Sequence, residues 1–513
     1  MKTIKTKTAA YLLAASTCLL LTNAKANNIY IQNVSVSGQI VSFTISWDNS
    51  WWTVGAPPNN YDAAWVFVKF QDCTGPSVFP WSHAALNTTS STHTITCQAG
   101  CTTPTLTIDA VSDGMGVFIH RTGMGSGSTG TWNVSLTATT VSGYLNTTNT
   151  RVFGIEMAYI PGAVNFSAGD GSGTTTAPFN DNLGIPGNSY TVTSNGAIAA
   201  NALYAGHPGL NAAYPKGYDA FYCMKSEISQ EQYCSFLNTL TYDQQVTRTA
   251  LSPSYFASAL PWALTAPTPN TIPYNRNGIK LNVIGFNNFV PAKYIQDVNG
   301  DQAGSGATDG IHIACNYLSW GDVTAFLDWA ALRPMTELEY EKVCRGIDPS
   351  VADEYPWGGI TTTSLTSAFL TNPGAVNEVA TTPGNGLCVY DGAASLGPVR
   401  GGAAATSSTT RVQAAAAYYG PLDMAGNVWE QVVNVDANGA TFTGANGNGA
   451  LPTNGNADAA NWPSPTTAAG SGARGGSWFT TAANAQQLRT SDRTNAGTGT
   501  ATRNMEYGGR GLR

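Results

Sequence analysis

The segment Leu422-Asp423-Met424-Ala425-Gly426-Asn427-Val428-Trp429-Glu430 decides the fold of this 513-residue chain. It places two carboxylates, a glycine and a tryptophan close together in a region that is rich in glycine and poor in charge. Seven other segments with similar Gly, Trp and acidic residues lie on either side of it. They are Glu156–Gly162, Lys225–Ser229, Asn316–Trp320, Arg333–Glu341, Tyr355–Gly358, Arg474–Trp478 and Gly509–Arg513.

Taken in this order, the eight segments resemble the formylglycine-generating enzyme family, also called sulfatase-modifying factors. Each segment alone is unspecific, whereas the ordered set covers the chain from about residue 152 to 513. The resemblance implies a fold related to C-type lectins, compact but with little regular secondary structure. We therefore expect an α+β protein, in which an N-terminal all-β sandwich precedes a formylglycine-generating-enzyme-like domain.

Three capping boxes predict helices in this second domain. Ser229-x-x-Gln232, Ser319-x-x-Asp322 and Thr336-x-x-Glu339 each precede apolar residues at helical spacing. From Gly346 onward the chain is mostly Gly, Thr, Ala and Asn, with few regular signals. Such a long irregular stretch needs additional support, and bound metal ions or dense Trp packing are the expected means.

The first 150 residues predict a leader and a β-sandwich. A basic start, the apolar run Ala9–Leu21 and the small residues Ala24-Lys25-Ala26 predict a signal peptide over residues 1–26. Residues 27–150 carry short alternating or β-branched segments separated by turns, which is typical of a sandwich domain, and residues 151–513 form the second domain. The expected strands are Ile29–Val34, Ile40–Trp47, Ala64–Phe70, Thr105–Ala110, Gly116–His120 and Trp132–Thr137, with Phe153–Ile160 opening the second domain.

Charge and cysteine content limit the possible functions. Loss of the leader's four lysines leaves 20 basic against 31 acidic residues, so a nucleic-acid partner is not expected. No later stretch predicts a membrane span. Eight cysteines remain, and Cys97-x-x-x-Cys101 favours a local disulfide over a metal site because no second ligand pair lies nearby. The adjacent Trp51 and Trp52 indicate either a packed strand end, which we favour, or a sugar-stacking surface.

The family's best-known activity, by resemblance, oxidises a cysteine in a sulfatase peptide to formylglycine with oxygen and Cu(I). Two cysteines after the Gly-Gly-Ser-aromatic motif hold the copper, because Cu(I) prefers sulfur ligands. Here Thr480 and Ala485 stand at those two positions, and no cysteine follows Cys388. Copper is therefore not expected. The five histidines form no pair at ligand spacing, which also disfavours a histidine-based iron site.

Calcium is the expected cofactor. The resemblance assigns a structural calcium site to the Asp423 and Glu430 side chains and the Gly426 and Val428 carbonyls, and such hard oxygen ligands suit Ca²⁺. The alternative is a capped turn packed by Trp429. Asp297-Val298-Asn299-Gly300-Asp301 also looks like the start of a calcium loop. Because Gln302 replaces the sixth-position glycine and Thr308 the twelfth-position glutamate, we interpret it as a polar surface loop.

The C-terminal segment Phe479–Met505 has several interpretations. In the catalytic family this region lines the peptide groove, and in retroelement-diversified lectin folds a similar segment is the variable binding face. We predict that Ser477, Trp478, Arg489, Arg493 and Arg503 contribute to a binding face. The alternative is that the arginines pair with carboxylates such as Asp492 and Glu506.

These observations favour a non-catalytic, exported protein that acts as a binding or structural module, either secreted or at the cell surface. Its expected partner is a protein or glycan. Exported proteins of Bacteroidota carry similar domains. Two alternatives stay open: a divergent formylglycine-generating oxidase, and a self-assembling subunit of an extracellular fibre or layer, suggested by the weakly charged, Gly/Thr/Asn-rich composition.

Overall fold

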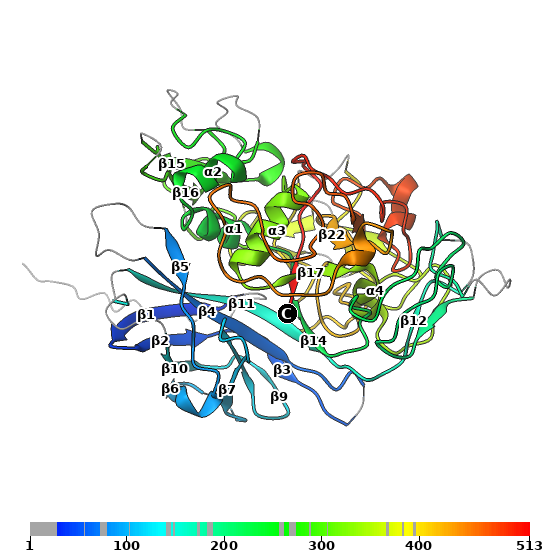
Figure 1. Cartoon of the computed structure of the whole chain (residues 1–513), viewed down its shortest axis with the longest axis horizontal. Coiled ribbons are helices and arrows are strands. Elements are labelled where there is room, and N and C mark those ends of the chain that lie inside the picture. Colours follow the sequence, from blue (N-terminus) through cyan, green and yellow to red (C-terminus); the bar gives the residue numbers. More distant parts are fainter. Residues whose placement is uncertain are drawn as a thin grey trace, which may run out of the picture.

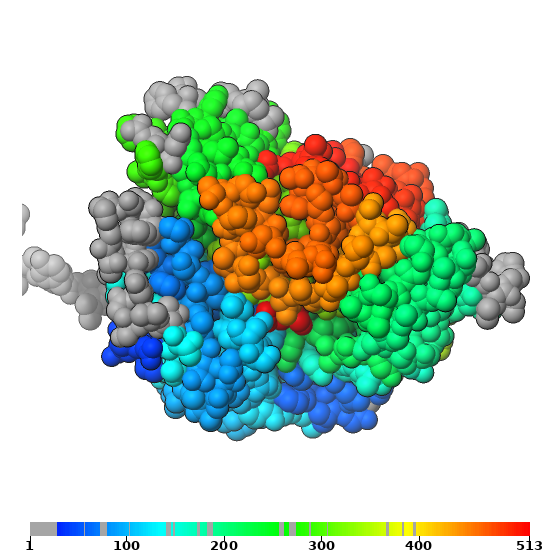
Figure 2. Space-filling model, viewed as in Figure 1, coloured from blue at the N-terminus to red at the C-terminus, as the bar shows by residue number. Residues whose placement is uncertain are grey.

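A computed structural model describes residues 28–513 except 56, 72–79, 102, 140–144, 147–148, 172–174, 182–187, 256–260, 266–272, 287–288, 305, 366–368, 382–383 and 393–396. The predicted leader and Cys73 lie outside the described residues. The protein has an α+β fold in which the N-terminal strands lie under a larger, mostly irregular second domain (Figure 1). Figure 2 shows the two parts in broad contact, with the N-terminal strands in blue.

The first part contains the six strands that the sequence predicts and four others. They are β1 (Tyr30–Ser37), β2 (Ile40–Ser46), β3 (Ser50–Trp52), β4 (Asp62–Gln71), β5 (Trp81–His83), β6 (Thr94–Ala99), β7 (Leu106–Ala110), β8 (Val117–Arg121), β9 (Gly125–Gly127) and β10 (Thr131–Thr137). The four others are β3, β5, β6 and β9. The sheet β1-β2-β10-β6 packs face to face on β4, β8 and β7. The expected Cys97–Cys101 disulfide is present.

The second part combines four α-helices with short strands. The helices are α1 (Gln230–Leu237), α2 (Tyr242–Arg248), α3 (Trp320–Trp329) and α4 (Glu337–Arg345). The strands are β11 (Thr150–Ile160), β12 (Phe166–Ala168), β13 (Tyr190–Val192), β14 (Phe221–Met224), β15 (Ile279–Val283), β16 (Lys293–Gln296), β17 (Arg333–Thr336), β18 (Thr363–Ser364), β19 (Leu370–Thr371), β20 (Val379–Ala380), β21 (Leu387–Cys388), β22 (Glu430–Val433), β23 (Ser471–Arg474) and β24 (Gly511–Leu512).

All three predicted capping boxes are confirmed. The side chains of Ser229, Ser319 and Thr336 each accept the backbone N–H of the residue three positions later, and their own backbone N–H donates to that residue's side chain. Helix α2 was not predicted, although Thr241 and Gln244 form a fourth capping box. No helix in the described part of the chain is long and apolar enough to cross a membrane.

One sheet runs through both parts. Its order is β23-β22-β17-β24-β14-β11-β4-β8-β7, and β5 pairs with β4. Strand β11, which opens the second domain, pairs with β4 along its length, from Thr150 opposite Phe70 to Ala158 opposite Asp62. The expected division at residue 150 therefore falls at the start of the strand that joins the two parts.

Strand β4 is buried on both faces, and its alternate residues enter two different cores. Ala64, Val66 and Val68 pack into the sandwich core, whereas Trp65 and Phe67 pack under α1 and α3. The Trp51 ring lies against Gly420 and beneath the Lys225 ammonium, and Trp52 stacks on Tyr61. The two tryptophans thus form a packed strand end, as the favoured interpretation expected.

Because the sheet is shared, we predict that the protein unfolds in one cooperative transition. Phe43→Ala in the sandwich core and Phe67→Ala in the helical core should each lower the free energy of unfolding by about 3–5 kcal/mol and shift that same transition. Differential scanning calorimetry measures both. Phe289→Ala, at a side chain that is 79% exposed, is the matched control and should leave the transition nearly unchanged. Two separate transitions would contradict a shared sheet.

Candidate functional site

The Leu422–Glu430 segment forms a buried turn that leads into β22. Asp423, Gly426 and Asn427 all have positive φ angles, of 54°, 76° and 59°. A Cβ atom at Gly426 would lie 2.5 Å from both the Cys388 sulfur and the Val389 carbonyl oxygen, so only glycine fits there. Close packing therefore fixes the position of the Asp423 and Glu430 carboxylates and of the Gly426 and Val428 backbone.

A third buried carboxylate, Glu227, lies beside Asp423 and Glu430. Arg510, itself fully buried, donates to Glu430 Oε1 at 2.5 Å and lies 3.9 Å from Glu227 Oε2. Arg510 contacts all three residues, because its guanidinium also donates to the Asp423 carbonyl at 3.2 Å. Glu227 was missed as a site residue, although it belongs to one of the eight quoted segments, Lys225–Ser229.

Several carboxylate oxygens in this group accept no hydrogen bond from any described residue: both of Glu227 and Oε2 of Glu430. Asp423 Oδ2 accepts the Gly402 N–H at 2.5 Å. Burial raises the pKa of all three carboxyls, most strongly that of Glu227. A buried acceptor without a donor is costly, and a hard cation would satisfy Glu430 Oε2. Carboxylate oxygens such as those of Asp423 and Glu430 are the type of ligand that the predicted Ca²⁺ ion prefers.

Thr480 and Ala485 stand at the two positions that the family resemblance assigns to copper ligands, and neither provides the sulfur atom that Cu(I) prefers. Thr480 is buried, and its Oγ1 accepts the Ser477 N–H at 2.9 Å. Ala485 packs against an apolar cluster that includes Trp357 and Leu488.

The free cysteines in the described part of the chain do not supply a replacement. All five are buried: Cys223, Cys234, Cys315, Cys344 and Cys388. Burial raises the pKa of each thiol and so disfavours the thiolate that binds metal or reacts.

Ser477 and Trp478, predicted as part of a binding face, lie inside the molecule. The Ser477 hydroxyl donates to Glu506 Oε2 at 2.7 Å, and the Trp478 indole N–H donates to the Met505 carbonyl at 3.0 Å. Only 2% of Trp478 is exposed. Both residues therefore hold the C-terminal segment in place, and a direct role in ligand binding stays a prediction.

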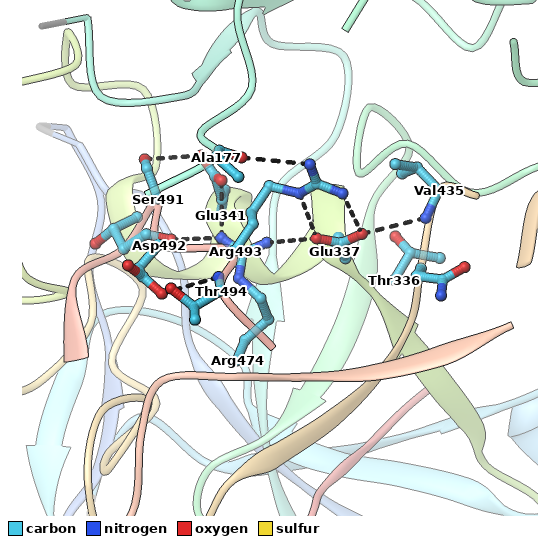
Figure 3. Close-up of polar contacts among 12 residues, drawn as sticks. Ala177, Thr336, Glu337, Glu341, Val435, Arg474, Ser491, Asp492, Arg493 and Thr494 are labelled. Carbon is cyan, nitrogen blue, oxygen red and sulfur yellow. Dashed lines mark hydrogen bonds and ion pairs between the residues drawn. The ribbon is translucent and has the colours of Figure 1, made fainter. Parts of the chain in front are cut away.

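The three predicted arginines all pair with carboxylates, but not with the partners that the alternative named. Arg493 forms a two-pronged pair with Glu337 at 2.7 and 3.0 Å (Figure 3). Arg503 donates to Asp322 at 2.8 Å, and Arg489 to Asp353 at 2.8 Å. These pairs connect the C-terminal segment to the starts of α3 and α4 and to the loop after α4.

Around Arg493 the pairs merge into a buried network. Arg474, fully buried, donates to Glu337 at 3.0 Å and to Glu341 at 2.8 Å, while Ser491 also donates to Glu341 (Figure 3). The guanidinium groups of Arg493 and Arg474 lower the pKa of Glu337 against the effect of its burial. The network joins α4, β23 and the C-terminal segment where regular secondary structure is scarce.

A cleft of about 330 Å³ opens between the two parts of the molecule. Its apolar wall includes Phe67, Phe326 and Trp329, and its polar wall includes Glu227 and Glu231. Lys225 and the Asn28 N–H both donate to Glu156, another lining residue, at 2.9 Å. Ligand sites often lie at such domain boundaries, with an apolar lining and a few polar groups.

Comparison with known proteins adds a family match to this geometry. The family model described as the sulfatase-modifying factor enzyme 1-like domain matches residues 172–511, which is more than half of the chain. No curated protein matches the chain. The match begins after β11 and includes the buried carboxylates Glu227, Asp423 and Glu430 as well as Arg474, Arg493 and Arg510.

The buried network leads to a prediction. Arg474→Met should lower the free energy of unfolding by about 3–5 kcal/mol, because it removes one charge and leaves buried carboxylates underpaired. Denaturant unfolding measures the change. Arg489→Met is the matched control: its pair with Asp353 is partly exposed, and its loss should cost about 1 kcal/mol or less. Equal effects of the two substitutions would contradict the structural role of the network.

Proposed function

The chain belongs to the sulfatase-modifying factor enzyme 1-like family, and we propose that it is a non-catalytic member that binds a ligand outside the cytoplasm. One feature carries the proposal: Thr480 and Ala485 stand at the two positions that the family resemblance assigns to the copper thiols, and the hydroxyl of Thr480 is used in a local turn. The burial of the five free cysteines supports it, because none presents a thiolate to a substrate.

The same proposal includes a structural Ca²⁺ ion held by Asp423 and Glu430, with the Gly426 and Val428 carbonyls as further ligands. Glu227, which lies 3.9 Å from the Arg510 guanidinium that pairs with Glu430, is a buried neighbour of this site and not a third carboxylate ligand. A divalent cation would offset the burial that raises the pKa of the Asp423 and Glu430 carboxyls. In this role the metal stabilises the turn before β22 and takes no part in a reaction.

We place the ligand in the cleft between the two parts of the molecule. Glu231 is the exposed carboxylate of one wall, because Glu156 is paired with Lys225 and Glu227 is buried beside Arg510, and it favours a ligand with positively charged or hydroxyl groups. The aromatic side chains of Phe67 and Trp329 provide an apolar surface opposite. A basic protein segment or a glycan at the cell surface has this combination of groups.

The absence of catalysis is tested by incubating the purified protein with Cu(I), oxygen and a sulfatase-type cysteine peptide. Mass spectrometry should detect no formylglycine above a control without protein. The double variant Thr480→Cys/Ala485→Cys should bind Cu(I) more tightly than the wild type in a competition with a chromogenic chelator, since it restores soft ligands. Formylglycine production by the wild type would contradict the proposal.

The binding role is tested by thermal-shift screening of basic peptides and glycans. A ligand of the cleft should raise the melting temperature of the wild type and bind Ser235→Trp at least about tenfold more weakly, because the indole fills the cleft that Ser235 lines. Ser408→Trp, at an exposed position outside this cleft, is the control and should bind normally. Undiminished binding to Ser235→Trp would place the ligand elsewhere.

A further inference from the structure

Three aspartates of one loop converge at a site separate from the buried turn. They are Asp297, directly after β16, and Asp301 and Asp309 further along the same loop. One carboxylate oxygen of each lies within 4.8 Å of those of the other two. Among the residues that the structure describes, this is the only group of three acidic, histidine or cysteine side chains so arranged. In Figure 1 the β15–β16 hairpin lies at the periphery, well apart from β22.

The burial of this group points to a missing positive partner. Asp297 is fully buried and Asp309 is 2% exposed, whereas Asp301 reaches solvent. The Gly306 N–H donates to Asp309 Oδ2, but Asp309 Oδ1 is buried and accepts no hydrogen bond from any described group. Burial and the charges of Asp301 and Asp297 raise the pKa of Asp309. An orphaned, buried carboxylate oxygen facing two other carboxylates is the environment that a metal ion relieves.

The charge of the site suits a divalent cation. The Lys280 ammonium pairs with Asp297 Oδ2 at 3.0 Å, and both side chains are buried. Three carboxylates and one ammonium leave a net charge of −2, which a divalent ion neutralises. The ligands on offer are oxygens, which favour Ca²⁺ or Mg²⁺ over zinc and copper. A loop with several carboxylates and adaptable geometry favours Ca²⁺ of these two.

The two departures from a calcium loop that the sequence indicates are both compensated in space. Gln302, at the sixth position, has a φ of 69°, which is the left-handed conformation that glycine normally provides there. The twelfth position, Thr308, carries no carboxylate, but Asp309 directly after it brings its carboxylate back to Asp297 and Asp301. The interpretation as an ordinary polar loop rested on these two positions.

We propose that Asp297, Asp301 and Asp309 bind a Ca²⁺ ion that is distinct from the one proposed at Asp423 and Glu430. The ion fixes the loop against the irregular part of the second domain. The Gly310 N–H donates to the Gly374 carbonyl, and the Val376 N–H donates to the Ala307 carbonyl, so the loop directly supports residues 374–376. This site does not depend on the proposed binding function.

Isothermal titration of chelator-treated full-length protein with CaCl₂ tests the proposal. Asp309→Asn should lose one equivalent of bound Ca²⁺ or weaken it by a factor of about 10 or more, since changes in the outer shell alone cost that much. Asp301→Asn should do the same, and because Asp301 is exposed this variant keeps its fold. Asp423→Asn should leave this equivalent intact, and Asp243→Asn, an exposed aspartate on α2, should change nothing.

Terbium luminescence locates the ion. The Trp262 ring lies 5.3 Å from the Lys280 ammonium that pairs with Asp297, so Trp262 is placed to transfer energy to Tb³⁺ at this site. The Tb³⁺ emission should fall in Trp262→Phe and in Asp301→Asn, and an excess of Ca²⁺ should displace it. Unchanged Ca²⁺ binding in folded Asp301→Asn and Asp309→Asn would overturn the proposal.

Discussion

Strand β4 is buried on both of its faces, and both parts of the molecule are packed onto it. The alternation of side chains along a strand sends Ala64, Val66 and Val68 into the sandwich and Trp65 and Phe67 into the helical core. Its long pairing with β11 carries the sheet from one part into the other. The C-terminal Arg513 lies over the Trp65 ring, so the end of the chain also packs on this strand. The cleft lies where β1, β11 and α1 meet.

Beyond this sheet the second domain is held by charged side chains more than by secondary structure. Arg474, Arg493 and Arg510 are almost fully buried, and each pairs with a carboxylate from a distant part of the chain. Buried pairs of this kind contribute modest net stability, because desolvation offsets most of the attraction. Their geometric demands are strict, however, since an unpaired member is costly. These ion pairs therefore favour a single arrangement of the loops, which contain little regular secondary structure. Buried tryptophans such as Trp357 and Trp478 stabilise the same arrangement.

The local features of the fold were predictable from the sequence, and the long-range ones were not. Capping boxes and alternating residues depend on neighbours within a few positions, so α1, α3, α4 and the main sandwich strands agree with expectation; α2 carried the same signal at Thr241 and was overlooked. The partners of Arg493 and Arg503 lie 156 and 181 residues away, and no spacing rule reaches so far. Glu227 likewise joins Asp423 and Glu430 only through the fold. Asp309 was missed because the comparison with a calcium loop ends at its twelfth position, which is Thr308. The carboxylate of Asp309, one residue later, lies close to those of Asp297 and Asp301.

On the proposed function, the difference between copper and calcium chemistry explains how this fold can form without the copper ligands that the family resemblance assigns to the oxidase. A Cu(I) site depends on two soft sulfur atoms, and no oxygen ligand replaces them, so two substitutions remove it. The surrounding turn needs only a hydrogen-bond acceptor, which Thr480 Oγ1 supplies to the Ser477 N–H. The hard carboxylates of the Leu422–Glu430 turn serve the fold and are retained along with the glycine that their position requires. On the proposed function, this chain therefore has the oxygen ligands and arginine pairs that build the framework and lacks the thiols that the family resemblance assigns to the reaction.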